Sequence, residues 1–307
     1  MFHIFALTCV VAAGVAHGAT VLILPRFEVS VLLTLFRRWR PTVFHGVPTM
    51  FIGILNSPDA TPEHFDSVRV CMSGGAPLPV PVMHAFQERM LRRGRISEGY
   101  GLSETSPVTH ANPVDGAVVA GSIGQPVRDT EVRIVDVETG TRDLPIGEAG
   151  ELVICGPQVM AGYWRAPEET ARVLRDGWLH TGDIGYRDAD GYYYLVDRKK
   201  DLIIAGGFNV YPREVEESLF LHPGIQEALV IGVADPYRGE TVKAFVVCRS
   251  NAALTSEEVL THCRSRLASY KVPRLVEFRA ALPKSGVGKY LRRELRREEE
   301  ARVSGQK

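Results

Sequence analysis

Ser103 and Glu104 place a hydroxyl beside a carboxylate in the segment 100–107 of this 307-residue sequence. Both groups are hard oxygen donors, and together they suit a Mg²⁺ ion that bridges a phosphate. The same residues also fit a helix N-terminus that is capped by Ser103 or Thr105. The segment by itself leaves both interpretations open.

Asp183 is a second candidate, because it stands between Gly182 and Gly185 in the segment 177–185. A carboxylate between glycines can accept two hydrogen bonds from a vicinal diol such as that of a ribose. A turn stabilised by the aspartate explains the same residues equally well.

Two glycine-containing segments are further candidates. Gly74 and Gly75 follow an apolar run and allow a backbone to approach a flat or anionic ligand closely, although a plain tight turn also explains them. Gly286 and Gly288 precede Lys289 in what we expect to be a mobile loop. A lysine there could offset charge at the α-phosphate of ATP, whereas the alternative is an exposed surface turn.

The charged stretch 197–201 fits a linker or a hinge that absorbs backbone rotation between two domains. In the second interpretation Arg198 is available to a nucleotide. Chain length alone favours two domains.

Upstream of this stretch the pattern predicts two layers. In 1–125 apolar runs alternate with helical segments, and a strand over 67–73 followed by a helix over 79–93 indicates an α/β layer. In 126–197 short strands separated by Gly and Asp turns predict a small barrel or meander. Those strands are expected at 131–137, 151–155 and 192–196.

Downstream of residue 201 the pattern predicts a compact α+β module. A helix over 213–221 follows Pro212, and Thr255 with Glu258 forms a capping box that opens another helix. Strands are expected at 228–233, 241–248 and 275–278. The basic run 292–297 precedes three glutamates and predicts the solvated face of a terminal helix.

The N-terminus allows two interpretations. Residues 4–16 are apolar apart from Thr8, which fits a signal peptide or a membrane span. No Lys or Arg precedes Arg26, however, and a second apolar run at 21–24 also fits a buried helix followed by a buried strand.

Composition narrows the function classes. The formal net charge is zero, which argues against a nucleic-acid binder. Five scattered cysteines without a CxxC pair indicate reduced thiols in the cytosol. The nine histidines show no ligand spacing, so we expect no zinc site.

In this order and at these spacings, the segments resemble the adenylate-forming superfamily of acyl-CoA synthetases, peptide-synthetase adenylation domains and luciferases. Within this superfamily, the sequences of the segments are most similar to those of fatty-acid–CoA ligases. The matching segments are FHIF (2–5), SGGAPL (73–78), YGLSETSP (100–107), GSIGQPV (121–127), GELVICGPQVMAGYW (150–164), GWLHTGDIG (177–185), DRKKDLIIAGGFNVYPREVE (197–216), YKVPRLVEF (270–278) and LPKSGVGKYLRREL (282–295).

The resemblance implies an α/β fold with a partial large domain at 1–197, followed by a small, mobile α+β domain at 198–307. The large domain would comprise the α/β layer 1–125 and a β-barrel-like part at 126–197, and the hinge would lie at 198–201. The resemblance also favours the buried interpretation of the N-terminal run.

The resemblance further assigns residue roles. Lys289, Glu104 and Ser103 would be catalytic, with Glu104 holding Mg²⁺. The nucleotide would be bound by Gly75, Ala76, Pro77, Tyr100, Gly101, Leu102, Asp183 and Arg198. Lys200 would be the hinge, His3 and Phe5 would border the acyl group, and Gly206, Gly207 and Phe208 would approach CoA.

The implied substrates are a small carboxylic acid, ATP and CoA, in a cytoplasmic protein with at most peripheral contact to a membrane. The sequence departs from the family in one respect, because the Ser/Thr/Gly-rich loop that cradles the β- and γ-phosphates is absent. We therefore expect weak adenylation from ATP and an exposed apolar surface. That surface would pair with a missing N-terminal half or with a second copy. A non-catalytic remnant and a peptide-synthetase adenylation domain are the alternatives.

Overall fold

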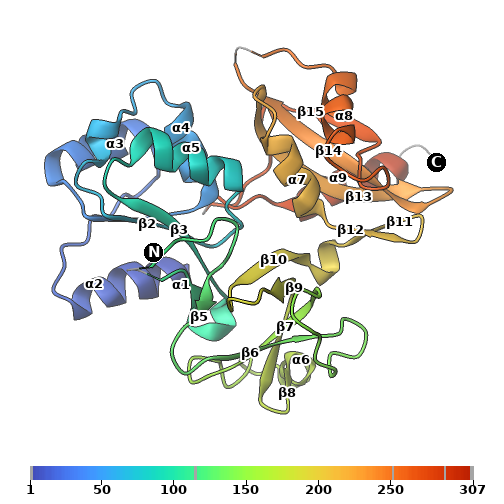
Figure 1. Cartoon of the computed structure of the whole chain (residues 1–307), viewed down its shortest axis with the longest axis horizontal. Coiled ribbons are helices and arrows are strands. Elements are labelled where there is room, and N and C mark those ends of the chain that lie inside the picture. Colours follow the sequence, from blue (N-terminus) through green and yellow to red (C-terminus); the bar gives the residue numbers. More distant parts are fainter. Residues whose placement is uncertain (1–2, 114–115, 251, 287, 305–307) are drawn as a thin grey trace. The chain divides into compact units, whose positions relative to one another are not determined.

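The computed structural model describes residues 3–113, 116–250, 252–286 and 288–304. The chain forms two compact units, Met1–Leu195 and Val196–Lys307 (Figure 1). The boundary lies at residues 195–196, within strand β10 (Tyr193–Arg198) and two residues before the border expected at 197–198.

The first unit contains a five-stranded sheet in the order β1-β2-β3-β4-β5. Its first three strands are parallel, and the last two are antiparallel to their neighbours. The strands are β1 (Val43–Gly46), β2 (Val70–Ser73), β3 (Arg95–Gly101), β4 (Val108–Ala111) and β5 (Gln125–Pro126). This arrangement confirms the predicted α/β layer.

Three helices lie on one side of the parallel strands in Figure 1: α3 (Val29–Trp39), α4 (Pro48–Asn56) and α5 (Val80–Met90). A proline occupies the first turn of α4 and of α5, where no helical N–H bond is lost. Phenylalanines from these helices, from β1 and from the turn η2 (Pro62–Phe65) form a closed ring of edge-to-face contacts. They are Phe36, Phe44, Phe51, Phe86 and Phe65, with centroids 4.9–5.5 Å apart.

The prediction of a buried N-terminal helix followed by a buried strand is wrong in two respects. Residues 4–16 are helical, with a π-helical middle (Leu7–Ala12) between α1 (Ile4–Ala6) and α2 (Ala13–Ala16), but no residue of these segments is buried. Residues 21–24 form neither a helix nor a strand. A buried strand needs a hydrogen-bonded neighbour, and none of the described residues provides one.

The second sheet of this unit has the order β10-β9-β7-β6, with β8 paired to β9. A register shift between Glu151 and Val153 bends β7 where it pairs with β9, as a bulge does. The turn pattern predicted a small barrel or meander, and this sheet forms a half-barrel. Its elements are β6 (Glu131–Val135), β7 (Gly150–Cys155), α6 (Pro167–Val173), β8 (Leu174–Arg175), β9 (Trp178–Arg187) and β10.

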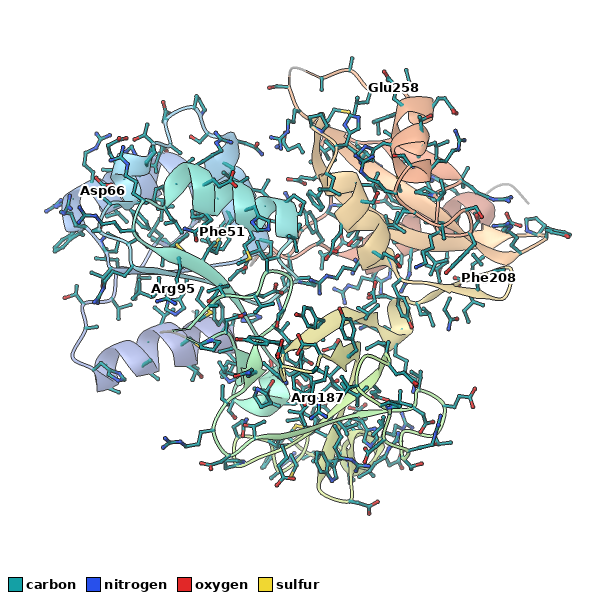
Figure 2. The ribbon with its side chains drawn as sticks, viewed as in Figure 1. Phe51, Asp66, Arg95, Arg187, Phe208 and Glu258 are labelled. Atoms are coloured by element: carbon teal, nitrogen blue, oxygen red, sulfur yellow. The ribbon has the colours of Figure 1, made fainter. Side chains whose placement is uncertain are left out.

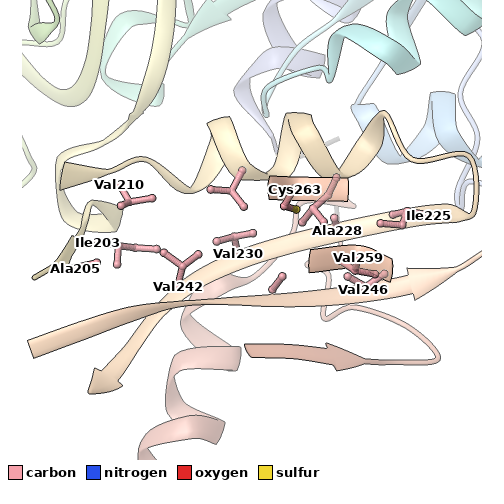
Figure 3. Packing of buried hydrophobic residues seen from close by; sticks show 13 residues of the cluster. Ile203, Ala205, Val210, Ile225, Ala228, Val230, Val242, Val246, Val259 and Cys263 are labelled. Atoms are coloured by element: carbon pink, nitrogen blue, oxygen red, sulfur yellow. The ribbon is translucent and has the colours of Figure 1, made fainter. Parts of the chain in front are cut away.

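The second unit is built on the strand order β12-β11-β14-β13, with β15 parallel to β14. Helices α7 and α8 cover a thirteen-residue core that includes Val230, Val246 and Cys263 (Figure 3). The elements are η4 (Lys199–Asp201), β11 (Ile203–Ala205), β12 (Phe208–Val210), α7 (Pro212–Phe220), β13 (Ile225–Asp235), β14 (Gly239–Cys248), α8 (Ser256–Arg264), β15 (Leu275–Phe278) and α9 (Arg292–Ser304).

Two local predictions in this unit have opposite outcomes. The capping box is confirmed, because Thr255 Oγ1 accepts from Glu258 N (3.3 Å) and Glu258 Oε2 accepts from Thr255 N (2.8 Å). The solvated basic face of α9 is wrong for Arg292 and Arg296, whose side chains are 23% and 29% exposed. Both arginines pair with carboxylates of neighbouring elements.

All five cysteines are free thiols, and Cys71 and Cys263 are buried. Across the parts of the chain that the structure describes, no helix combines the length and the apolar character needed to cross a membrane.

Candidate active site

A short hydrogen bond joins two of the predicted site residues, Tyr100 and Asp183. Tyr100 lies near the end of β3 and Asp183 in the middle of β9, yet the Tyr100 hydroxyl donates to Asp183 Oδ2 at 2.5 Å. Asp183 is only 6% exposed. A carboxylate is the type of acceptor that a vicinal diol binds, so an aspartate at this position fits the ribose of a nucleotide.

The backbone around Asp183 is fixed by its neighbours. Thr181 Oγ1 accepts from Asp183 N (3.1 Å) and donates to the Leu152 carbonyl (2.8 Å). Gly182 has φ +71°, a conformation that favours glycine, and its N–H donates to Glu151 Oε1 at 3.0 Å. Gly182 therefore allows the backbone conformation that the strand has next to Asp183.

His110 is a site neighbour that the sequence motifs did not single out. It pairs with Tyr100 across β3 and β4, and its ring lies between those of Tyr100 (5.7 Å) and Tyr193 (4.8 Å). Burial lowers the pKa of His110 to about 3, so the imidazole is neutral at physiological pH. The sequence motifs gave no signal for it, because its position depends on the pairing of β4 with β3.

Glu104 lies in the turn η3 (Ser103–Thr105) after β3 and is half-buried. Its Oε1 accepts a hydrogen bond from the Tyr163 hydroxyl at 2.8 Å. Burial and this hydrogen bond raise the pKa of Tyr163 to about 12. Tyr163 is thus a second residue that was not predicted, although it lies in the matching segment 150–164.

The two hydroxyls of this turn have different surroundings. Thr105 is buried, and its Oγ1 accepts from Leu102 N (2.9 Å) and donates to the Pro107 carbonyl (2.6 Å). Ser103 is exposed. Thr105 therefore stabilises the turn from its third position, and neither Ser103 nor Thr105 is the N-cap, which is Leu102.

Glu104 fits a magnesium ion only in a particular way. Within the described ranges no group of three or more His, Cys, Asp or Glu side chains could hold a metal ion. Mg²⁺ commonly takes one or two carboxylates and completes its shell with substrate phosphates and water. A single glutamate beside a nucleotide site meets that requirement.

Gly75 and Gly101 are each favoured at their positions, for different structural reasons. Gly75 has φ +80°, which favours glycine, and a Cβ on Gly101 would overlap the Pro107 carbonyl oxygen. Ala76 is half-buried and Pro77 is exposed. The loop is anchored just behind Pro77, where Leu78 N donates to Glu98 Oε1 at 3.3 Å.

The N-terminal helix contributes to the same region. A Cβ on Gly74 would lie 3.0 Å from the Phe5 ring, so Phe5 packs directly on the glycine loop. The Phe5 ring also meets the His45 ring edge-on at 5.7 Å, and burial lowers the pKa of His45. His3 Nδ1 accepts from Phe5 N at 3.3 Å. Phe5 thus lies beside the glycine loop, and His3 is linked to it through the Phe5 N–H.

In the second unit Lys289 belongs to a short hairpin closed by a β-bridge between Lys284 and Tyr290. Ser285 N donates to the Lys289 carbonyl (2.8 Å), and Lys289 N donates to Ser285 Oγ (3.1 Å). Lys284 Nζ donates to Glu227 Oε1 at 2.6 Å and ties the hairpin to β13. Val287 of the matching segment lies outside the described residues.

The other predicted residues of this unit lie on its surface. The side chains of Arg198 and Lys200 are exposed. Gly206 and Gly207 (φ +63° and +84°) form the tip of the β11–β12 hairpin. Beside them Phe208 is 55% exposed (Figure 2). Its ring stacks on that of Tyr270, with ring centroids 4.7 Å apart.

Comparison with known proteins defines the class. Residues 1–164 match the family model "AMP-binding enzyme", and residues 214–289 match "AMP-binding enzyme C-terminal domain". The chain therefore belongs to the AMP-binding enzymes, the adenylate-forming family that its motifs resemble.

Named relatives refine this class. The chain is 52% identical over 300 residues to a long-chain-fatty-acid–CoA ligase of Bacillus subtilis, covering 97% of this chain and 53% of the relative. It is 43% identical over 307 residues to the Escherichia coli O157:H7 protein of the same name, covering 99% and 53%. A feruloyl-CoA synthase of Amycolatopsis is 42% identical over 300 residues, covering 97% and 60%.

Solved structures of similar enzymes support the same family. ATP-bound MatB from Rhodopseudomonas palustris superposes with a TM-score of 0.90 at 36% identity, covering 96% of this chain and 58% of that chain. The anthranilate CoA ligase AuaEII in complex with anthranoyl-AMP gives 0.86 at 32% identity, covering 94% and 56%. The chain thus spans about half the length of the curated relatives that it matches.

Proposed function

We propose that this chain is the part of an acyl-CoA ligase that holds the acyl-adenylate and transfers the acyl group to CoA. The observation that carries the proposal is the buried Asp183 carboxylate bonded at 2.5 Å to Tyr100 of β3, the strand that pairs with β2 ahead of the glycine loop. A diol-binding acid next to a flexible-backbone loop suits a nucleotide monophosphate.

The reaction has two steps, which determine the residue roles. An oxygen of the carboxylic acid attacks the α-phosphorus of ATP, and the bond to pyrophosphate breaks. The CoA sulfur then attacks the acyl carbon, the bond to AMP breaks, and AMP leaves with the electron pair. AMP is a good leaving group, so positioning and charge stabilisation carry the barrier.

In the first unit, Asp183 binds the ribose and Tyr100 lies against the adenine, next to Gly75, Ala76 and Pro77. Gly101, Leu102 and Ser103 hold the α-phosphate or the acyl carboxylate, and His3 and Phe5 border the acyl group. Mg²⁺, when bound, offsets phosphate charge, and Glu104 is the residue that would hold it.

In the second unit, Lys289 stabilises the α-phosphate during adenylation, and Arg198 reaches the ribose. A rotation at Lys200 then replaces Lys289 with the surface of Gly206, Gly207 and Phe208, which admits the CoA arm. Free thiols and cytosolic substrates favour the cytoplasm, with at most peripheral contact to a membrane. Adenylation from ATP is impaired, because no loop in the sequence cradles the β- and γ-phosphates.

Binding of AMP to purified protein tests the site itself. We expect Asp183→Asn to weaken AMP binding at least about tenfold, while 2′,3′-dideoxy-AMP binds the unchanged protein equally weakly. Asp176→Asn is the matched control, since Asp176 is exposed and has φ +50°, which asparagine tolerates. Equal binding of AMP and the dideoxy analogue would contradict the role of Asp183.

Separate assays of adenylation and of thioester formation test the proposed activity. We expect little ATP-dependent pyrophosphate exchange and clear thioester formation when preformed acyl-AMP and CoA are supplied. Robust exchange would contradict the impairment.

A second candidate is a non-catalytic half that binds nucleotide and pairs with a separate N-terminal half or with another copy. The exposed apolar residues of the N-terminal helix, such as Leu7 and Val15, favour it. AMP binding without any thioester formation from acyl-AMP would select this candidate.

A further inference from the structure

Helix α9 starts three residues after Lys289 and is held to its unit mainly by ion pairs. Leu295 is its fully buried side chain, at 0% exposure. The charged residues of the helix contact two different places. Glu299 and Arg302 pair with Lys243 and Glu277 of the sheet, whereas Arg292 and Arg296 point to the segment 197–201 and to α7.

Arg292 joins three elements. Its Nη2 donates to both carboxylate oxygens of Glu216 in α7 (2.7 and 2.6 Å), and its Nε donates to the Val230 carbonyl of β13 (3.3 Å). Its Nη1 lies 3.9 Å from Asp201 Oδ2. A bidentate, largely buried pair of this kind fixes the start of α9 in one orientation.

Asp201 follows directly on Lys200, and its side chain is only 9% exposed. Its Oδ1 accepts from Arg296 Nη1 at 2.9 Å, and the same Nη1 lies 3.4 Å from the Lys200 carbonyl oxygen. Arg292 and Arg296 are one helical turn apart, so both reach the same carboxylate. A buried carboxylate needs such partners to remain charged.

Asp197, at the other end of the segment 197–201, is hydrogen-bonded to the start of α7. Asp197 Oδ2 accepts from the backbone N–H of Arg213 at the start of α7 (2.9 Å), and its Oδ1 accepts from Arg198 N (2.7 Å). A rotation at Lys200 must therefore separate residue 197 from α7, while residue 201 stays with α9.

We propose that Asp201, Arg292 and Arg296 are positioning residues that confine the domain rotation to Lys200 and fix the path from there to Lys289. The segment after the pivot is bound to the helix that begins three residues after the lysine, so both move as one body. This inference rests on the roles proposed above for Lys200 and Lys289.

Backbone amide exchange of the full chain without substrate tests it. We expect Arg296→Ala and Asp201→Asn to speed exchange about tenfold in peptides that cover 198–203, with a parallel increase in those that cover 288–291. Arg296→Lys, which keeps a cation within reach of the Asp201 carboxylate, should leave the protection of both peptides close to that of the unchanged chain.

Glu299→Gln is the matched control, because it weakens the sheet end of α9 by removing the 2.8 Å pair with Lys243. It should speed exchange only in the C-terminal half of the helix. Unchanged exchange at 198–203 in Arg296→Ala, or an equal increase there in Glu299→Gln, would overturn the proposal. These readings need no nucleotide, so they are independent of the AMP-binding test.

Discussion

The two units differ in how completely they enclose their apolar residues. In the C-terminal unit two clusters fill both sides of the sheet, one around Val230 and Val246 and one around Phe245 and Leu295. In the N-terminal unit the helix at 4–16 has no buried residue at all. Parallel strands are usually covered on both faces, and this helix gives only a partial cover.

The difference concerns where each unit has its core. The C-terminal unit has its core within its own sequence, and its matched family model describes a domain. The N-terminal unit exposes Leu7 (47%), Val15 (72%) and Ile23 (58%), in a chain about half as long as its relatives. The apolar run that suggested a buried helix therefore lies on the surface of its unit.

The largest effect is expected when a buried phenylalanine is replaced in the core of one unit at a time. Phe51→Ala in the aromatic ring and Phe245→Ala in the second unit each remove a side chain of 0% exposure, and each should cost about 3–5 kcal/mol. All three tryptophans (Trp39, Trp164 and Trp178) lie in the first unit, so their fluorescence reports that unit alone.

In denaturant titrations Phe51→Ala should lower the midpoint of the fluorescence transition, and Phe245→Ala should not. Circular dichroism should detect the second variant. Equal shifts of the fluorescence midpoint in both variants would mean that the units unfold together, and the comparison would fail.

The next largest effect is acid sensitivity of the second unit. Hydrogen bonds from Arg302, Lys243 and Arg279 lower the pKa of Glu277 to about 2, against burial that raises it. A depressed carboxyl pKa stabilises the fold above its unfolded value near 4.5, and this contribution disappears as the pH falls towards 2. It amounts to at most about 3 kcal/mol.

Glu277→Gln should therefore be less stable than the unchanged chain at pH 7 and should lose less stability between pH 4.5 and pH 2. Thermal unfolding followed by circular dichroism across this range measures the difference. The exposed Glu148, changed to Gln, is the control. Parallel pH curves for Glu277→Gln and the unchanged chain would refute the contribution of this ion cluster.

The smallest effect on stability is expected at the exposed apolar helix. Leu7→Gln combined with Val15→Gln should change the free energy of unfolding by less than about 0.5 kcal/mol, because neither side chain is buried. The same variant should clearly reduce binding of a hydrophobic dye. Leu221→Gln, at a 55% exposed position of the second unit, should reduce it much less.

The local features of this protein are decided by residues that are close in sequence. The capping box at Thr255 and Glu258, the helix after Pro212 and the strand that leads into Gly74 were all predictable. Each depends on hydrogen bonds or backbone angles within a few residues, and those follow from residue type. The order and spacing of the motifs likewise indicate the family, because both are properties of the linear chain.

Contacts between residues that are remote in sequence could not be predicted, because the tertiary structure decides them. The Tyr100–Asp183 bond joins residues 83 positions apart, and His110 lies behind it only because β4 pairs back onto β3. Arg292 and Arg296 looked solvated, since the sequence shows their charge but not the carboxylates that α7 and the segment 197–201 bring to them. Residues 21–24 have the composition of a buried strand, and they form none because burial and strand pairing depend on a neighbour in space.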